Sequence, residues 1–122
     1  MSKEILVLAL GGNAIMSESR TFDSQYKTVY NATKVIADLV AEGYRIVITH
    51  GNGPQVGDAL FRHEYAKGLV PPLPLFACVA ETQGLLGSMI QLSLLNHFNK
   101  LGKRIGVVSL ISKVGFPERS CI

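Results

Sequence analysis

The stretch YRIVITHGNGPQVG, from Tyr44 to Gly57, decides how this chain folds. Residues 44–49 are mostly apolar and β-branched, which predicts a buried strand. Glycines and an asparagine follow, and then Pro54, a residue favoured at the first position of a helix. A similar stretch, LALGGNA from Leu8 to Ala14, ends the apolar run 5–10. The sequence therefore predicts two strands that each end in a glycine-rich turn.

A helix is predicted between these two strands, after a loop over residues 11–24. Four residues recur there at helical spacing: Val29, Thr33, Ile36 and Val40. Asp23 or Ser24 is the expected N-cap of this helix, and Gly43 stands where a glycine would end it. A strand, a helix and a strand in this order form a βαβ unit. The run 5–10 has no polar alternation, which predicts a strand buried on both faces of a parallel sheet.

The remaining chain continues the alternation of helices and strands. Helices are predicted over 54–66 and 77–100, joined by the proline-rich connector 69–76. Residues 105–111 are predicted to form a third strand. We expect an α/β fold with a mainly parallel sheet, formed by residues 1–111 as one domain, and an irregular tail over 112–122.

Composition limits the class of protein. Apolar residues make up 48% of the 122 residues and charged residues 17%, as in a chain with a buried core. The longest apolar run has six residues, whereas a membrane span needs roughly 20, so we expect no membrane association. The net charge of +3 comes without a dense Lys/Arg tract, which disfavours nucleic-acid binding. No signal peptide and no disulfide spacing of Cys78 and Cys121 are apparent, which predicts a cytoplasmic protein.

The two glycine-rich turns are the candidate binding site. In a parallel sheet, ligands bind beyond the carboxyl ends of the strands, and glycines let backbone N–H groups approach an anion closely. Each asparagine amide adds a donor and an acceptor, which suits a carbamate or carboxylate better than a bare phosphate. The predicted substrate-binding residues are Gly11, Gly12, Asn13, Gly51, Asn52 and Gly53.

Each of these features also has a purely structural explanation. A glycine pair after a strand is more often a tight turn than a binding site, and His50 at a strand end usually bonds local backbone. His63, His97 and Glu81 are expected to be surface or satisfied helical residues. Gly84 and Gly87 most simply permit close helix packing. No histidines, cysteines or acids share a metal-ligand spacing, so no metal site is predicted, and the phosphate motifs G-x-x-x-x-G-K-[ST] and G-x-G-x-x-G are absent.

Three motifs in this order resemble the N-terminal half of carbamate kinase, in the amino-acid-kinase superfamily. They are LALGGNA (8–14), VITHGNGPQVG (47–57) and AETQGLLGSMIQ (80–91), and the resemblance covers residues 5–108. It implies a three-layer αβα fold, here truncated. It also implies phosphoryl transfer between ATP and carbamate, whose reverse makes ATP in arginine fermentation, and assembly as a homodimer. Relatives such as acetylglutamate kinase look as if they have a lysine at the position of Ala9. Carbamate kinases resemble this chain in lacking that lysine, which favours the carbamate kinase family.

In that family the N-terminal half holds carbamate or carbamoyl phosphate, and the C-terminal half holds ATP or ADP with Mg²⁺. The resemblance therefore assigns no nucleotide-binding or catalytic residue here, and catalytic lysines and an aspartate are not identified. The family strand that reads T-x-V-x-V-D is replaced by SLISKVGFPERSCI, from Ser109 to Ile122. We therefore expect this chain to be inactive alone. Two alternatives stay open: a non-catalytic dimerising module, and another amino-acid kinase acting on a carboxylate.

Overall fold

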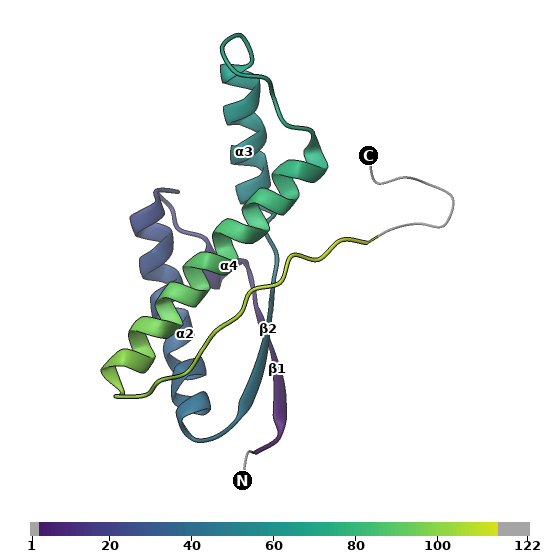
Figure 1. Ribbon diagram of the computed structural model, residues 1–122. Coiled ribbons are helices and arrows are strands. Elements are labelled where there is room, and N and C mark those ends of the chain that lie inside the picture. Colours follow the sequence, from purple (N-terminus) through teal and green to yellow (C-terminus); the bar gives the residue numbers. More distant parts are fainter. Residues whose placement is uncertain (1–2, 115–122) are drawn as a thin grey trace. The chain divides into compact units, whose positions relative to one another are not determined.

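The computed structural model describes residues 3–114. Its elements are β1 (Ile5–Leu10), α1 (Gly12–Ile15), α2 (Phe22–Ala41), β2 (Arg45–His50), α3 (Gly53–Ala66) and α4 (Leu75–Lys100), shown in Figure 1. The described residues form two compact units: the first contains 3–51 and 88–108, and the second 52–87 and 109–114. Helix α4 contributes residues to both. The predicted boundary between a domain 1–111 and a tail 112–122 stays a prediction.

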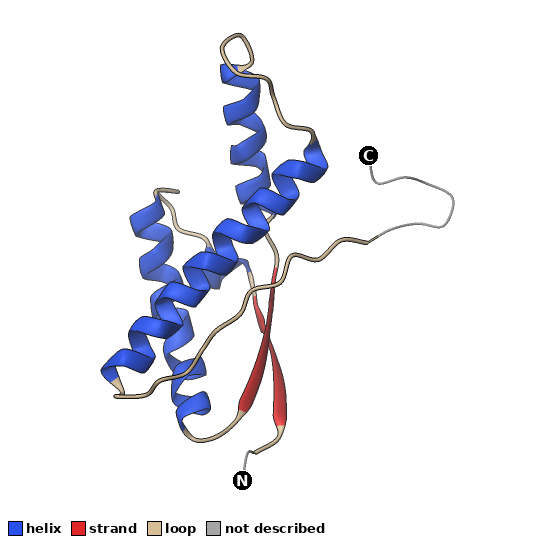
Figure 2. Cartoon of the chain, viewed as in Figure 1, coloured by secondary structure: helices blue, strands red, loops and turns tan. Residues whose placement is uncertain are grey.

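The first unit contains a parallel sheet of β1 and β2, as predicted (Figure 2). The strands pair in register from Ile5 with Arg45 to Leu10 with His50. Their burial alternates along the chain, so the prediction that both faces are buried is wrong for the described residues. Val7 and Val47, which pair, are 67% and 51% exposed. Within the first unit, the sheet therefore has one more covered face and one exposed apolar face.

The start of α2 differs from its prediction. Thr21, rather than Asp23 or Ser24, is the N-cap, and its hydroxyl accepts a hydrogen bond from the Ser24 N–H at 3.3 Å. Asp23 lies in the first turn, where a carboxylate interacts favourably with the helix dipole. The segment predicted as a loop over 11–24 also contains the short helix α1. Residues that can cap a helix and acids of its first turn lie close together in sequence, so the sequence alone does not identify which residue is the N-cap.

The end of α2 follows its prediction. Gly43 has φ of +107°, a backbone conformation that side chains strongly disfavour. Its N–H donates to Val40 O at 2.9 Å, and the Tyr44 N–H donates to Leu39 O at 3.2 Å. These two bonds form a Schellman motif, which satisfies the last carbonyls of the helix. Gly43 therefore ends α2 and turns the chain into β2.

Helices α2 and α4 pack through a buried polar contact within the first unit. The hydroxyls of Thr33 and Ser93 are fully buried and 3.0 Å apart. His97 is also buried; its Nε2 donates to the backbone oxygen of Tyr30 at 2.7 Å, and its ring stacks on the Tyr30 ring at 3.9 Å. Because a carbonyl only accepts, the proton lies on Nε2. His97 is thus a satisfied structural residue, as the sequence predicted.

The second unit is organised by α3 and the first half of α4. The prediction of both helices is confirmed; α3 begins at Gly53, so that Pro54 stands in the second helical position, and α4 begins at Leu75. Val56 and Ala59 of α3 form a buried cluster with Cys78 of α4. Residues 69–74 of the predicted connector have no regular structure, as expected, whereas its last two residues begin α4.

Residues 103–114, here called the extended segment, do not form the predicted third strand. Instead, glutamine side chains of α4 bond its backbone. Gln91 Nε2 donates to Val107 O at 2.8 Å, and Gln83 both donates to Ser112 O (3.2 Å) and accepts from Ser112 N (2.9 Å). A strand needs a neighbouring strand to pair with, and neither described strand pairs with this segment. Residues 115–122 of the predicted tail, with Cys121, lie outside the described residues.

Gly87 serves a different contact from the helix packing predicted for it. A Cβ atom at Gly87 would lie 2.8 Å from Ser109 Oγ and 3.0 Å from Ser109 Cβ. At Gly84 the nearest atom would be Ile111 Cδ1 at an ordinary 3.8 Å. The missing side chain of Gly87 therefore lets the extended segment lie against α4.

Helix α4 is long and apolar enough to cross a membrane by length and composition alone. Its polar residues identify it as a core helix instead. Thr82, Ser93 and His97 are each buried, and all three bond groups of this chain. The apolar residues Leu86, Met89 and Leu94 are buried against the protein as well, which explains the apolar character of α4 without a bilayer.

Candidate functional site

The two predicted turns begin at the same edge of the sheet. Leu10 and His50 are the last paired residues of β1 and β2, and Gly11 and Gly51 follow them directly. Both strands run in the same direction, so both turns leave from their carboxyl ends. This is the location at which parallel α/β sheets bind ligands.

The first turn is open and exposed. Gly11 has an extended backbone (φ −75°, ψ 175°), and its O accepts from the Ala14 N–H at 3.0 Å. The N–H groups of Gly12 and Asn13 lie in the first turn of a helix and have no acceptor within it. All three residues of the predicted site in this turn are exposed.

The glycines of these turns are not required by the backbone. Among the described glycines, only Gly43 and Gly102 have φ in the left-handed region. A Cβ atom added at Gly11, Gly12 or Gly51 would meet nothing within 4 Å. Sterically, the described chain would accept a side chain at each position. The bare backbone at this edge therefore leaves room for a group from outside the described residues.

His50 and Asn52 both bond the protein itself. His50 Nδ1 lies 3.1 Å from the Gly51 O, which is the local contact expected of a histidine at a strand end. Asn52 donates from Nδ2 to Val79 O at 3.0 Å and to Thr82 Oγ1 at 2.8 Å. Because the Val79 carbonyl can only accept, the NH₂ group of Asn52 must face it.

Asn52 therefore braces the start of α3 against α4 within the second unit. The NH₂ group of Asn52, which was expected to contact a ligand, is engaged by these two bonds. The side-chain oxygen and the backbone of Asn52 are the groups that it can still offer to a ligand. The Val56 N–H donates to Asn52 O at 2.9 Å and closes the first turn of α3. Asn52 and Gly53 belong to the second unit, so a pocket shared with Gly11, Gly12 and Asn13 stays a prediction.

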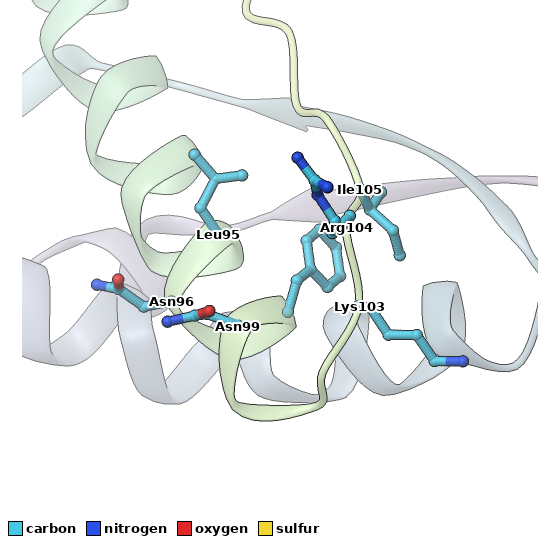
Figure 3. A pocket seen from close by; sticks show the side chains of 7 residues that line it. Leu95, Asn96, Asn99, Lys103, Arg104 and Ile105 are labelled. Atoms are coloured by element: carbon cyan, nitrogen blue, oxygen red, sulfur yellow. The ribbon is translucent and has the colours of Figure 1, made fainter.

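Sequence reasoning missed two groups of residues. One lines an open pocket of about 510 Å³ in the first unit, formed by Leu95, Asn96, Phe98, Asn99, Lys103, Arg104 and Ile105 (Figure 3). Its polar groups do not converge: in Figure 3 the Lys103 side chain points away from Leu95 and Arg104. A binding pocket usually presents a few polar groups to one point, so this pocket is not a candidate site.

The other group is His63, Cys78 and Glu81. Their potential ligand atoms all lie within 4.8 Å of one another. No pattern along the sequence signals this group, because α3 and α4 bring it together from opposite sides of the proline-rich connector.

One titratable side chain has a displaced pKa. Lys100 Nζ donates to the Tyr30 hydroxyl at 2.7 Å. This hydrogen bond raises the pKa of Lys100 above 10.5. Lys100 ends α4 and fastens it to α2, so its role is structural.

Carbamate kinases are among the known proteins that resemble this chain in sequence. Carbamate kinase 2 of Enterococcus faecalis is 41% identical over 109 residues, which are 88% of this chain and 35% of that protein. Carbamate kinase of Pyrococcus horikoshii is 40% identical over 114 residues, 90% of this chain and 36% of that protein. The chain thus spans about a third of the length of these relatives.

The fold of this chain is also similar to part of a carbamate kinase structure. The structure of carbamate kinase from Giardia lamblia bound to AMP-PNP superposes with a TM-score of 0.78 at 36% identity, over 85% of this chain and 37% of that one. The family model for the amino acid kinase family matches residues 4–109, close to the span 5–108 predicted from the motifs. Because this match covers most of the chain, the chain belongs to the amino acid kinase family.

Proposed function

We propose that this chain is the carbamate-holding part of a carbamate kinase-type phosphotransferase, which interconverts ATP plus carbamate and ADP plus carbamoyl phosphate. The observation that carries the proposal is the bare backbone at the sheet edge. Gly11, Gly12 and Gly51 follow paired strand ends, and neither φ nor neighbouring atoms require glycine there. A ligand that needs close contact with main-chain N–H groups explains all three glycines together.

The chemistry that these turns supply is positioning and charge neutralisation. Phosphoryl transfer asks for little covalent chemistry from the protein and depends on aligned groups and stabilised oxygen charge. The N–H groups of Gly12 and Asn13 would donate to a carboxylate or phosphoryl oxygen. The exposed Asn13 amide would distinguish the NH₂ end of a carbamoyl group from its oxygens. Fixed donors of this kind act as an oxyanion hole does.

We expect the nucleotide site to lie outside these residues, so no step is assigned to ATP or Mg²⁺. The sequence lacks both phosphate-binding motifs, and the relatives are about three times as long as the matched region. We therefore expect the 122 residues alone to form no ATP from carbamoyl phosphate and ADP. A coupled assay, with full-length enzyme excluded by mass spectrometry, tests this expectation.

Ligand binding is tested separately, by thermal unfolding with carbamoyl phosphate. A ligand that binds only the folded state raises the melting temperature. At a ligand concentration of one hundred times Kd, it adds about 2.7 kcal/mol to the free energy of unfolding. The variant Gly12→Val should fold, because the space beside Gly12 is open, but should lose this response. Gly68→Val, at another open position beyond the end of α3, is the matched control and should retain it. An equal response in wild type and Gly12→Val would contradict the assignment.

A second function is favoured by the uncovered sheet face. Ile5, Val7 and Val47 are all more than half exposed there, and large exposed apolar patches mark association surfaces. The chain would then be a non-catalytic module that dimerises, with a second copy on this face. Sedimentation that shows a monomer at high concentration would exclude this function. A carboxylate substrate in place of carbamate is tested by competition for the carbamoyl phosphate response.

A further inference from the structure

We propose that His63, Cys78 and Glu81 form a binding site for a thiophilic divalent cation, with Zn²⁺ as the expected ion. This site lies within the second unit and involves none of the glycine turns. The proposal is independent of the kinase function. It rests on the ligand types, their separation and the way two helices hold them.

The ligand types suit zinc. Imidazole nitrogen, thiolate sulfur and carboxylate oxygen are the three groups that bind Zn²⁺ in proteins. A set of three protein ligands leaves one position of a tetrahedral ion for water. Mg²⁺ and Ca²⁺ prefer sites built from oxygen, so the thiol of Cys78 selects against them.

The separations are close to those of a tetrahedral site. Zinc bond lengths of about 2.0–2.3 Å place neighbouring ligand atoms about 3.3–3.6 Å apart. His63 Nε2 and Glu81 Oε2 are already 3.6 Å apart, and all three ligand atoms lie within 4.8 Å. Side-chain movements of roughly 1 Å within this group would bring all three separations to tetrahedral values.

The two helices hold the ligands in place before an ion arrives. Cys78 and Glu81 stand three residues apart on α4, so they share one face of that helix. His63 faces them from α3, which is fixed to α4 by the buried contact of Ala59 with Cys78 and by the two hydrogen bonds of Asn52. The Cys78 sulfur is buried, whereas Glu81 is half exposed, so an ion would enter from the solvent side past the carboxylate.

Binding of the ion displaces one proton from Cys78 and moves another within the His63 ring. Cys78 releases its thiol proton to solvent. The Leu73 N–H donates to His63 Nδ1 at 3.4 Å, so the imidazole proton stands on Nε2. On binding, this proton moves to Nδ1 and the long contact from Leu73 is replaced by water, which the exposed connector admits. The ion then joins α3 to α4 across the proline-rich connector.

The test is titration of the full chain with Co²⁺ alone, a spectroscopic substitute for Zn²⁺, followed by competition with Zn²⁺. We expect one equivalent to bind with a sulfur-to-cobalt charge-transfer band in the near ultraviolet. Cys78→Ser should abolish the band. Cys121→Ser, the matched control for the other cysteine, should retain it. Binding weaker than on the order of millimolar, or a band that survives in Cys78→Ser, would overturn the proposal.

A second pair of variants guards against a folding defect in Cys78→Ser, since that residue is buried. Glu81→Gln removes one ligand at a half-exposed position. Glu64→Gln removes a neighbouring carboxylate that pairs with Lys67 instead. Loss of a residue that only hydrogen-bonds a metal ligand weakens metal binding by roughly 10- to 100-fold. We expect Glu81→Gln, which removes a ligand itself, to weaken Co²⁺ binding by at least this factor. Glu64→Gln should leave Co²⁺ binding unchanged. Equal affinities in both variants would also overturn the proposal.

Discussion

Asn52 offers the sharpest test of how the second turn works. The sequence suggests a ligand contact, whereas in the structure its side chain joins α3 to α4 through Val79 O and Thr82 Oγ1. Replacing Asn52 with alanine removes both hydrogen bonds. The same change at Asn13, which is exposed in the first turn, removes a side chain that has no such structural role. The two variants therefore separate bracing from ligand binding.

The expected loss of stability follows from these contacts. Each hydrogen bond contributes about 1 kcal/mol, so Asn52→Ala should lower the free energy of unfolding by about 2 kcal/mol. Neither partner becomes an orphan, because Thr82 Oγ1 still donates to Cys78 O at 2.8 Å and the Val79 carbonyl lies inside helix α4, where the helix backbone satisfies it. No cap is lost either, since the Asn52 side chain makes no capping bond. Asn52→Asp should destabilise more, because a carboxylate oxygen would face the Val79 carbonyl.

Urea denaturation followed by circular dichroism measures these differences. A loss of about 2 kcal/mol corresponds to a melting temperature lower by about 10 °C for a chain of this size. Asn13→Ala should stay within about 0.5 kcal/mol of wild type, as most exposed substitutions do. If Asn52→Ala and Asn13→Ala unfold at the same urea concentration with the same slope, Asn52 is not a brace, and the reasoning from its hydrogen bonds is refuted.

Two further outcomes are expected in other parts of the fold. Gly87→Ala should increase hydrogen exchange in the extended segment, because the new methyl group would lie 3.0 Å or less from Ser109; Gly84→Ala, with 3.8 Å of clearance, should not, and equal exchange in both would refute the contact. Tyr30→Phe should lower the pKa of Lys100 in an NMR titration, because the phenol hydrogen bond raises it. As the folded-state pKa is the higher one, this contribution to stability is present below pH 10.5 and is lost as the pH rises through the folded value. An unchanged Lys100 pKa in Tyr30→Phe would contradict this.

Local patterns predicted the elements whose cause is local. The apolar runs 5–10 and 44–49 became β1 and β2, and the glycine at 43 ended α2 through its positive φ. The family motifs also predicted the matched span and the location of both turns after paired strand ends. Periodicity and glycine placement are sufficient for these features, because each depends on residues a few positions apart.

Features that depend on distant partners could not be predicted in this way. The run 105–111 has the composition of a strand, but among the described residues it pairs with no strand, and Gln91 of α4 bonds its backbone instead. The donors of Asn52 are engaged by residues far along the chain. The group around Cys78 likewise depends on how α3 packs on α4.

The uncovered face of the sheet has a consequence for handling this polypeptide. Ile5 to Leu10 is a six-residue window without charge or proline, and β1 and β2 each have one unpaired edge over residues 3–114. Such windows stack between molecules into cross-β aggregates when they are accessible. A lysine at Val7, whose side chain already points to solvent, would act as a gatekeeper against fibril growth. It would keep the chain dispersed without disturbing the packed side of the sheet.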